Sequence, residues 1–486
     1  MTSTPTARDL TLAQILERQQ QAFLADPQPG VKIRRDRIQR LKQLVLDNTA
    51  ELTEAMREDY GSRPETFSTL TDIASSIPDL DTQRANLKKW MKPDRPSRLL
   101  DAAGFTQQVR KDPKGVVGII GPWNFPLYLT IVPAGSALGA GNRVMVRPSS
   151  VTAHTTEVLC RRAPEYFAVD ELAFAGPEHG RGADFSKLAY DHLFFTGSPE
   201  VGKSVAKDAA DNLTPVTLEL GGKNPVVVDD SADIERAARS IASARMINGG
   251  QVCMCPDYVF VPEADLDTFC NTVLDQWRST LPSIVGNPEY TATINTSNYE
   301  RIIGLIDDAV AKGATKRDAA PAGERLPDPI VRKIAPTLLT GVTPDMEIDS
   351  DEVFGPVLTV FAYKTIDQVV RYINDRPSPL VLYWYGDKNE RFETLADRTR
   401  SGNIYANDFG IGMASSAIPF GGVGNSGMGG YHGHYGFRTF THERAVAHHS
   451  FDMNASQLMV PPFTKGKKRI ASAYAGAMKA RTRLGF

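Results

Sequence analysis

The sequence predicts an α/β fold with one parallel sheet in each half of the chain. Short apolar runs of strand length alternate with segments of helical periodicity, and a similar alternation continues to about residue 407. Such alternation is typical of parallel sheets that are covered by helices on both faces. A chain of 486 residues is also long enough for two or three domains. The clearest candidates are strands at residues 116–120, 144–146, 192–195 and 226–228, with a helix at residues 199–211.

The first part of the chain predicts helices. From residue 12 to about residue 87, apolar residues recur at helical spacing among many charges, as amphipathic helices require. A second stretch of this kind, residues 66–90, ends before Pro93, and a proline helps to stop a helix. Residues 97–114 lose the helical period, so we expect a hairpin excursion there.

Composition argues against several classes of protein. The 55 Lys and Arg residues nearly balance the 57 Asp and Glu residues, for a formal charge of −2, which disfavours nucleic acid as the main partner. Four cysteines cannot provide a disulfide framework for this length, so a reducing compartment is favoured. The N-terminus lacks the apolar core of a signal peptide, and no apolar run approaches the ~20 residues needed to cross a bilayer. We therefore expect a cytoplasmic protein.

The C-terminal segment, residues 451–486, differs from the rest in charge. No acidic residue follows Asp452, whereas seven basic residues do. A basic amphipathic tail can contact anionic lipid. We favour the alternative, a solvated tail that packs one stripe on its own protein. The residues that can share one helix face are Ile470, Tyr474, Ala477 and Met478.

Two of the four cysteines, Cys253 and Cys255, stand one residue apart behind Gly249 and Gly250. A metal site is disfavoured because no second Cys or His cluster lies nearby, and a disulfide across one residue would be strained. Thiolates form where backbone N–H groups or positive charges stabilise them, and glycines leave room for a substrate carbonyl. A catalytic nucleophile and simple buried packing both remain open from these residues alone.

Two further segments carry polar groups in unusual settings. Asn124 lies between prolines directly after the strand at 116–120, where its amide can be a rigid hydrogen-bond donor or part of a turn. Glu219 lies between two leucines and before two glycines. Burial raises a carboxyl pKa and suits a general base near neutral pH, although an exposed glutamate on a strand edge fits this segment equally well.

A strand-to-helix junction at Gly197 resembles an anion site. Ser198 and Gly202 follow in the first turn of the predicted helix, where free N–H groups and the helix dipole can face a phosphate. The spacing is not G-x-G-x-x-G, so this segment alone is weak evidence.

Taken together, these segments resemble the aldehyde dehydrogenase superfamily over nearly the whole chain, to about His449. Three further segments are similar to the class 3 and coniferyl aldehyde dehydrogenase branch: C-M-C-P-D-Y at 253–258, K-K-W-M-K-P at 88–93 and G-M-G-G-Y-H-G at 427–433. The ordered superfamily motifs are G-P-W-N-F-P at 121–126, F-T-G-S-x-x-x-G at 195–202, L-E-L-G-G-K-N-P at 218–225, G-G-Q-V-C at 249–253, E-V-F-G-P-V at 352–357 and P-F-G-G-V-G-N-S-G-M-G at 419–429.

The resemblance implies a role for each matching residue. Cys253 would attack the aldehyde, the Asn124 amide and the Cys253 N–H would hold the oxyanion, and Glu219 would activate water to hydrolyse the thioester. Cys255 stands where relatives commonly have alanine, which implies packing, with a redox role as the alternative. The implied cofactor residues are Trp123, Gly197, Ser198, Gly202, Glu352 and Phe354.

One motif departs from the pattern. Relatives usually read K-P-S-E where this chain has Arg147-Pro148-Ser149-Ser150, and the lysine and glutamate bind the adenosine ribose. A guanidinium without the carboxylate should tolerate or attract a 2′-phosphate. We therefore expect NAD or NADP as cofactor, with substantial use of NADP.

The resemblance also implies the architecture: a Rossmann-like coenzyme domain, an α/β catalytic domain and a small β oligomerisation element. We expect a homodimer, as is typical of class 3 relatives. The expected ranges are 1–96 and 115–218 for coenzyme binding, 219–412 for catalysis, 97–114 and 436–450 for oligomerisation, and 451–486 for the basic tail.

The substrate is less readable. Tyr128, Phe409, Ile411 and Met413 suggest an apolar pocket for aromatic aldehydes such as coniferaldehyde, or medium-chain aliphatic ones, although plain core packing fits them too. Alternatives are a CoA-acylating enzyme, which typically lacks the base at Glu219, a thiol acyl hydrolase that needs no nicotinamide, and a non-catalytic structural protein.

Overall fold

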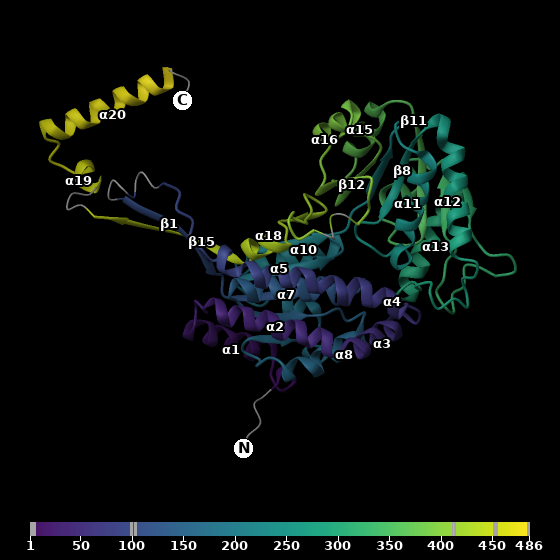
Figure 1. Ribbon diagram of the computed structural model, residues 1–486, viewed down its shortest axis with the longest axis horizontal. Helices are drawn as coiled ribbons and strands as arrows, with labels where there is room; N and C mark the ends of the chain where they lie inside the picture. The colour runs from purple at the N-terminus through teal and green to yellow at the C-terminus, as the bar shows by residue number, and fades with distance from the viewer. Residues whose placement is uncertain are drawn as a thin grey trace. The chain divides into compact units, whose positions relative to one another are not determined.

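A computed structural model of the chain describes residues 6–97, 101, 105–410, 412, 415–450 and 455–483 (Figure 1). The chain forms two compact units. The first comprises Met1–Trp90 and Asp112–His442, and the second comprises Met91–Lys111 and Glu443–Phe486. Among the described residues, no helix is both long and apolar enough to pass through a membrane.

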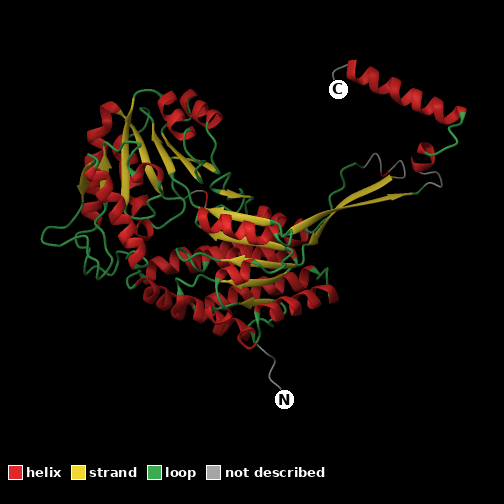
Figure 2. Cartoon of the chain, turned by 180° about the vertical axis from the view of Figure 1, so that it is seen from behind, coloured by secondary structure: helices red, strands yellow, loops and turns green. Residues whose placement is uncertain are grey.

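The first unit contains a six-stranded sheet that is parallel except for β14. Its central strands are buried along their length, as expected where helices cover both faces; red helices flank the yellow strands in Figure 2. In order across the sheet, the strands are β14 (Gly427–Met428), β6 (Val216–Leu220), β5 (His192–Gly197), β2 (Val116–Ile120), β3 (Arg143–Arg147) and β4 (Leu172–Phe174).

Helix α7 (Tyr128–Ala140) is the most buried element around this sheet. All its residues are buried, so it is a helix that is apolar on every side, packed between the sheet and the helices α2 and α5. Two glycines allow this, because a Cβ at Gly139 would lie 3.2 Å from the Ile38 side chain, and one at Gly135 would overlap Leu80. The N-terminal helices are α1 (Leu12–Ala25), α2 (Val31–Asp47), α3 (Thr49–Tyr60), α4 (Glu65–Ser68), the π-helical η2 (Thr69–Ala74) and α5 (Ser75–Trp90).

The second sheet of the first unit has seven strands and is parallel except for β9. The chain leaves the first sheet after Leu220 and enters the second at Asn224, two residues beyond the domain boundary expected at 218/219. In order, the strands are β13 (Asn403–Ala406), β12 (Val381–Tyr385), β7 (Asn224–Val228), β8 (Pro256–Pro262), β11 (Val357–Tyr363), β10 (Thr337–Thr340) and β9 (Thr315–Asp318).

The remaining helices of the first unit follow the alternation that the sequence predicts. One parallel sheet in each half is confirmed, as are the strand at 116–120 and the helix at 199–211. The helices are α8 (Ala153–Arg162), α9 (Gly182–Ser186), α10 (Pro199–Ala210), α11 (Ile234–Met246), α12 (Leu266–Thr280), α13 (Thr296–Ala311), α14 (Glu347–Ser350), α15 (Ile366–Asn374), α16 (Glu390–Arg398) and α18 (Gly433–Thr439).

The second unit contains a two-stranded sheet of β1 (Phe105–Pro113) and β15 (Thr441–His449). Of the hairpin expected at 97–114, the described strand β1 pairs with a strand from the far end of the chain, and Val109 forms an antiparallel bridge with Asp94. Residues 98–100 and 102–104 of that hairpin lie outside the described residues. The strand expected from residue 436 begins at Thr441, because α18 occupies Gly433–Thr439.

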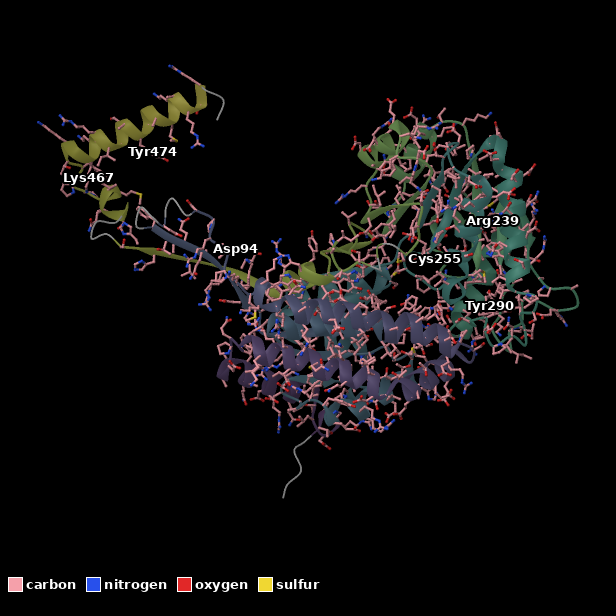
Figure 3. All side chains as sticks on the ribbon, viewed as in Figure 1. Asp94, Arg239, Cys255, Tyr290, Lys467 and Tyr474 are labelled. Atoms are coloured by element: carbon pink, nitrogen blue, oxygen red, sulfur yellow. The ribbon has the colours of Figure 1, made fainter. Side chains whose placement is uncertain are left out.

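The basic C-terminal segment is mostly helical where it is described, with residues 460–464 as a linker between two helices. It forms α19 (Ala455–Met459) and α20 (Lys465–Arg483). Ile470, Tyr474 and Met478 are exposed on α20, from which Lys467 and Tyr474 extend in Figure 3.

Candidate active site

The loop that carries Cys253 begins with a left-handed turn. After α11, the backbone of Asn248, Gly249 and Gly250 has φ values of 54°, 62° and 79°. Asparagine tolerates this region and glycine adopts it without strain. A Cβ at Gly249 would lie 2.9 Å from the Thr291 carbonyl oxygen, and one at Gly250 would overlap the backbone of Gly355. The two glycines therefore let the Cys253 loop pack closely against neighbouring backbone.

The two cysteines of this loop have different surroundings. Cys253 is partly exposed, whereas Cys255 is 2% exposed and its Sγ faces the Ala244 carbonyl oxygen at 3.4 Å. Asn224 Nδ2, at the start of β7, donates to the carbonyls of Cys253 at 2.8 Å and Cys255 at 3.0 Å. The Asn224 amide thus holds this loop, in which Cys253 is partly exposed and Cys255 packs in the core.

The environment of both thiols favours their neutral form. Burial raises the pKa of Cys255 to about 11. Burial also raises the pKa of Cys253, and the nearby carboxylates of Glu219 and Glu352 raise it further, while the backbone N–H groups of Met254 and Cys253 oppose them. Cys253 therefore needs a positive neighbour or a base before it can react as a thiolate.

Glu219 lies on β6, the second strand from one edge of the six-stranded sheet, and is 2% exposed. It pairs with Gly427 of β14, and its Oε1 has no hydrogen-bond partner among the described residues. Burial raises its pKa well above the ordinary value. An exposed glutamate on a strand edge is therefore excluded, and a buried, unpartnered carboxyl group stands within electrostatic range of Cys253.

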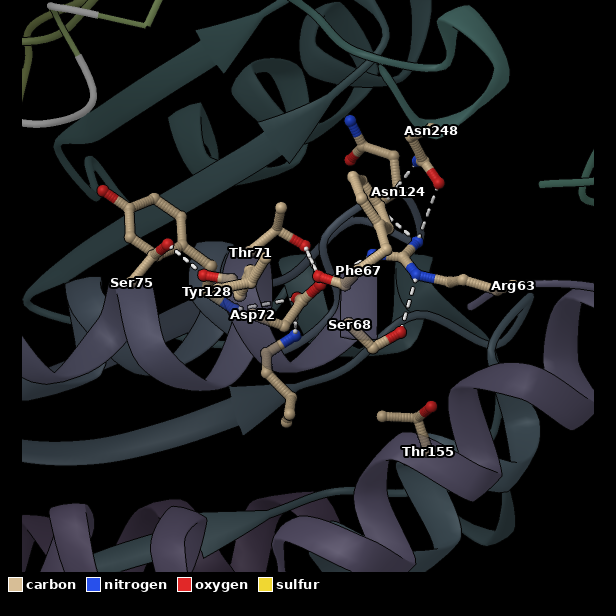
Figure 4. A network of polar contacts seen from close by, with 12 residues as sticks. Arg63, Phe67, Ser68, Thr71, Asp72, Ser75, Asn124, Tyr128, Thr155 and Asn248 are labelled. Carbon is tan, nitrogen blue, oxygen red and sulfur yellow. Dashed lines mark hydrogen bonds and ion pairs between the residues drawn. The ribbon is translucent and has the colours of Figure 1, made fainter. Parts of the chain in front are cut away.

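Asn124 lies in the turn between β2 and α7 and is 4% exposed. Its Nδ2 donates to the Gln251 carbonyl at 3.3 Å, which places the amide against the loop that carries Cys253. Its own carbonyl accepts a hydrogen bond from Arg63 Nη1 at 2.9 Å and one from Asn248 Nδ2 at 3.1 Å (Figure 4). The structure thus brings Asn124 to Cys253 from a different sheet.

Glu352 and Phe354 lie in the loop between α14 and β11. Glu352 lies over Gly221, where a Cβ would overlap its carboxylate, and burial followed by the charge of Asp257 raises its pKa to about 8. Phe354 has a strained φ of 47° and packs edge-on against Trp123, with ring centroids 5.3 Å apart. These residues gather at the glycine turn between the two sheets.

The expected phosphate site has the geometry of a capped helix start. Gly197 ends β5, and Ser198 Oγ accepts a hydrogen bond from Val201 N at 3.4 Å as the N-cap of α10. A Cβ at Gly202 would lie 2.6 Å from Leu220, so this glycine permits the close approach of α10 and β6. Of the first helical residues, Pro199 has no N–H group, and those of Val201 and Gly202 donate to Ser198, which leaves the Glu200 N–H and the helix dipole for an anion.

Arg147 differs from its expected role. It is 5% exposed, its Nη1 donates to the carbonyls of Ala175 and Gly176, and its Nη2 donates to the Gly180 carbonyl at 2.6 Å. The expectation of a free fork for a 2′-phosphate is corrected, because these carbonyls already occupy the guanidinium. Ser150, the other residue expected at this site, is exposed.

The expected substrate residues are only partly described. Tyr128 is buried and its hydroxyl lies 3.2 Å from His432 Nε2, and Phe409 stacks on Tyr383 with ring centroids 6.0 Å apart. Ile411 and Met413 lie outside the described residues. Sequence reasoning missed Arg63 and Asn248, which contact Asn124, and Asp72, which pairs with Arg63; only the folded chain brings them together.

Comparison with known proteins agrees with this geometry. The model of the aldehyde dehydrogenase family matches residues 2–446. The chain is 41% identical over 469 residues to the "Probable coniferyl aldehyde dehydrogenase" of Caulobacter vibrioides, covering 95% of this chain and 96% of that protein. It is 32% identical over 443 residues to "Aldehyde dehydrogenase, dimeric NADP-preferring" of Rattus norvegicus, covering 90% and 94%.

Among solved structures, the fold is similar to the substrate-bound state of Staphylococcus aureus AldH. The TM-score is 0.87 at 30% sequence identity, and the match covers 96% of this chain and 99% of that one. A partly exposed cysteine, an amide donor and a buried carboxyl group converge at the junction of the two sheets, and nearly the full length of the chain matches one family. The chain belongs to the aldehyde dehydrogenase family and is an oxidoreductase that acts on aldehydes.

Proposed function

We propose that this enzyme oxidises an aromatic aldehyde such as coniferaldehyde to the carboxylic acid, with NAD or NADP as oxidant. The observation that carries the proposal is the convergence of a partly exposed Cys253, the Asn124 amide and the buried, unpartnered Glu219 carboxyl group. Medium-chain aliphatic aldehydes are the second substrate class. The name of the relative from Caulobacter vibrioides supports coniferaldehyde as the first compound to test.

In the proposed reaction, the Cys253 thiolate attacks the aldehyde carbon and forms a thiohemiacetal. The Asn124 amide and the Cys253 backbone N–H donate to the oxyanion. A bound nicotinamide would supply the hydride acceptor that conversion of the thiohemiacetal on Cys253 to a thioester requires. Glu219 then takes a proton from water, which hydrolyses the thioester and releases the acid.

The surroundings of the site fit a nicotinamide dinucleotide. The Glu352 carboxylate over Gly221 would hold the nicotinamide ribose, with Phe354 and Trp123 beside the ring. The helix start at Gly197, Ser198 and Gly202 would receive the phosphates. Two observations support this fit: a Cβ at Gly221 would overlap the Glu352 carboxylate, and Glu219 Oε1 has no hydrogen-bond partner among the described residues.

Substantial use of NADP is part of the proposal. Ser150 carries no negative charge that would repel a 2′-phosphate, and this is the main support for NADP. Arg147 supports NADP less, because its guanidinium donates to backbone carbonyl groups. The name of the relative from Rattus norvegicus shows that NADP preference occurs in the family.

We also propose the domain roles and assembly. The six-stranded sheet, with residues 1–96 and 115–218, would bind the cofactor, and the seven-stranded sheet, within 219–412, would carry catalysis. The sheet of β1 and β15 would join a second copy of the chain in a homodimer. All four cysteines are free, which supports a reducing compartment such as the cytoplasm.

The test is formation of reduced nicotinamide by the purified protein. Coniferaldehyde and a medium-chain alkanal are each offered with NAD and with NADP, with and without CoA. Turnover without CoA, faster for coniferaldehyde, is the expected result. Turnover only after CoA is added would replace hydrolysis by acyl transfer to CoA, and turnover of the alkanal alone would move the substrate to the aliphatic class.

A further inference from the structure

Arg63 is a fully buried cation in the segment between α3 and α4. Its Nη2 donates to Asp72 Oδ2 at 2.7 Å, and both side chains are completely buried. Its Nε donates to Ser68 Oγ at 3.1 Å, and the rings of Tyr60 and Phe67 lie 4.7 and 5.0 Å from the guanidinium carbon. A buried arginine is tolerated only when its charge is balanced and its N–H donors have acceptors. Asp72 and Ser68 accept from Nη2 and Nε, so Nη1 is available to bind other groups.

Nη1 of Arg63 joins two segments that come from different sheets. It donates to the carbonyl of Asn124 at 2.9 Å and to Oδ1 of Asn248 at 3.1 Å (Figure 4). Asn248 Nδ2 in turn donates to the carbonyls of Asn124 at 3.1 Å and Gln251 at 3.2 Å. One guanidinium and one amide therefore fix the Asn124 turn against the left-handed turn that precedes Cys253.

Asp72 holds the other end of the same segment. Its Oδ1 accepts hydrogen bonds from the backbone N–H groups of Leu127 at 3.1 Å and Tyr128 at 3.2 Å, at the start of α7. The turn that carries Asn124 is thus held at both ends by the Arg63–Asp72 ion pair. With this backbone fixed, the Asn124 amide faces the loop that carries Cys253. Its Nδ2 has two N–H donors, and because one binds the Gln251 carbonyl, the second can bind an oxyanion.

We infer that Arg63 is a positioning residue for the oxyanion hole, which acts through Asn124 and Asn248. The inference rests on the proposed function, because it assumes that the Asn124 amide stabilises the oxyanion on a carbon bound to Cys253. A displacement of about 1 Å in such a site costs roughly 100-fold in rate. Arg63 does not touch the substrate; it sets where the amide donor lies.

The test uses a reaction that forms an oxyanion without a cofactor. With p-nitrophenyl acetate, the Cys253 thiolate attacks the ester carbonyl, p-nitrophenolate leaves, and the acetyl group remains as a thioester. Arg63→Lys keeps a positive charge beside Asp72 but cannot reach Ser68, Asn124 and Asn248 together. We expect acylation about 10- to 100-fold slower than in the wild type. Asn124→Ala should slow it by about 100- to 1,000-fold.

A second reaction of the same thiol separates positioning from general damage. Iodoacetamide alkylates Cys253 by displacement of iodide and forms no oxyanion, so its rate should stay within about twofold in Arg63→Lys. The double variant Arg63→Lys/Asn124→Ala should be no slower in acylation than Asn124→Ala alone, because the two residues act as a unit. Asn248→Gly, which suits the left-handed backbone, removes the second link and keeps the ion pair.

Arg34→Lys is the matched control, since Arg34 is equally buried but donates to carbonyls of Pro29 and Ala140. It should leave the acylation-to-alkylation ratio unchanged. Three results would overturn the inference. Arg63→Lys could lose acylation and alkylation equally, or Arg63→Lys and Asn248→Gly could both keep the full rate of acylation. The third is an acylation loss in the double variant that equals the sum of the two single losses. If Arg63→Lys does not fold, Asn248→Gly decides it alone. Failure of the wild type to oxidise any aldehyde would instead count against the proposed function.

Discussion

Glu219 is a carboxyl group whose surroundings disfavour its charge, and this has a consequence for the reaction. Burial raises its pKa well above the ordinary glutamate value of about 4.3. Only the carboxylate can take a proton from water, so base catalysis should be present above the raised pKa and lost as the pH falls below it. Because of burial, Glu219 ionises only at a higher pH, and its carboxylate is then a stronger base than that of an exposed glutamate.

The prediction concerns the pH profile of kcat. In the wild type, kcat should rise as the pH increases through the raised pKa of Glu219, whereas Glu219→Gln should lower kcat by at least about 100-fold and remove this rise. The measurement is kcat between roughly pH 6 and pH 10 with saturating aldehyde and cofactor. Glu54→Gln, which changes an exposed carboxyl, is the control. An unchanged slope in Glu219→Gln would show that another group is the base.

At the scale of elements, the periodicity of apolar residues was enough to predict the two sheets. Strands 116–120 and 226–228 and the helix at 199–211 form as predicted, because a buried parallel sheet needs short apolar runs between amphipathic helices. The pairing of β1 with β15 could not be predicted from local pattern, which does not reveal partners that lie more than 300 residues apart; only the family resemblance placed 97–114 and 436–450 in one β element.

The same limit applies to the site. The motifs located Cys253, Glu219 and Asn124, whose side chains lie beside glycines and prolines that mark unusual backbone. They could not locate Arg63, because its four polar partners come from three separate segments. The direction of the Arg147 guanidinium could not be predicted from the sequence either, because it depends on which carbonyl groups of the loop after β4 lie near it.

The loop after β3 carries a prediction about cofactor choice. Ser150→Glu would place a carboxylate where a 2′-phosphate is expected to bind, so like-charge repulsion should raise the KM for NADP by at least about 10-fold while that for NAD stays the same or falls. Initial rates with each cofactor measure this. Ser243→Glu adds the same charge to an exposed residue of α11 and should change neither KM. Equal increases for both cofactors would contradict the proposed position of Ser150.

At the scale of the whole molecule, the sheet of β1 and β15 is an unusual feature. It has two strands in the described part of the chain, and a two-stranded sheet is marginally stable without further partners. A strand edge readily adds another strand, so pairing with a second copy would satisfy this element.

We therefore predict a dimer in solution. Light scattering coupled to size exclusion should give about twice the chain mass of 53.2 kDa, and the value should persist on dilution to the concentration used for activity. A matched variant that lacks residues 455–483 of the basic tail should remain a dimer, because β1 and β15 are intact. A mass of one chain at working concentration would contradict this assignment of the β1–β15 sheet.

The central claim is that Cys253 is acylated during turnover and that Glu219 releases the acyl group. The most direct measurement is the intact mass of the Glu219→Gln variant after it is mixed with coniferaldehyde and NAD or NADP, followed by mapping of the modified peptide. We expect one acyl group per chain on Cys253, with one equivalent of reduced nicotinamide formed. An unmodified Cys253 after nicotinamide reduction, or an acyl group on Cys255, would contradict it.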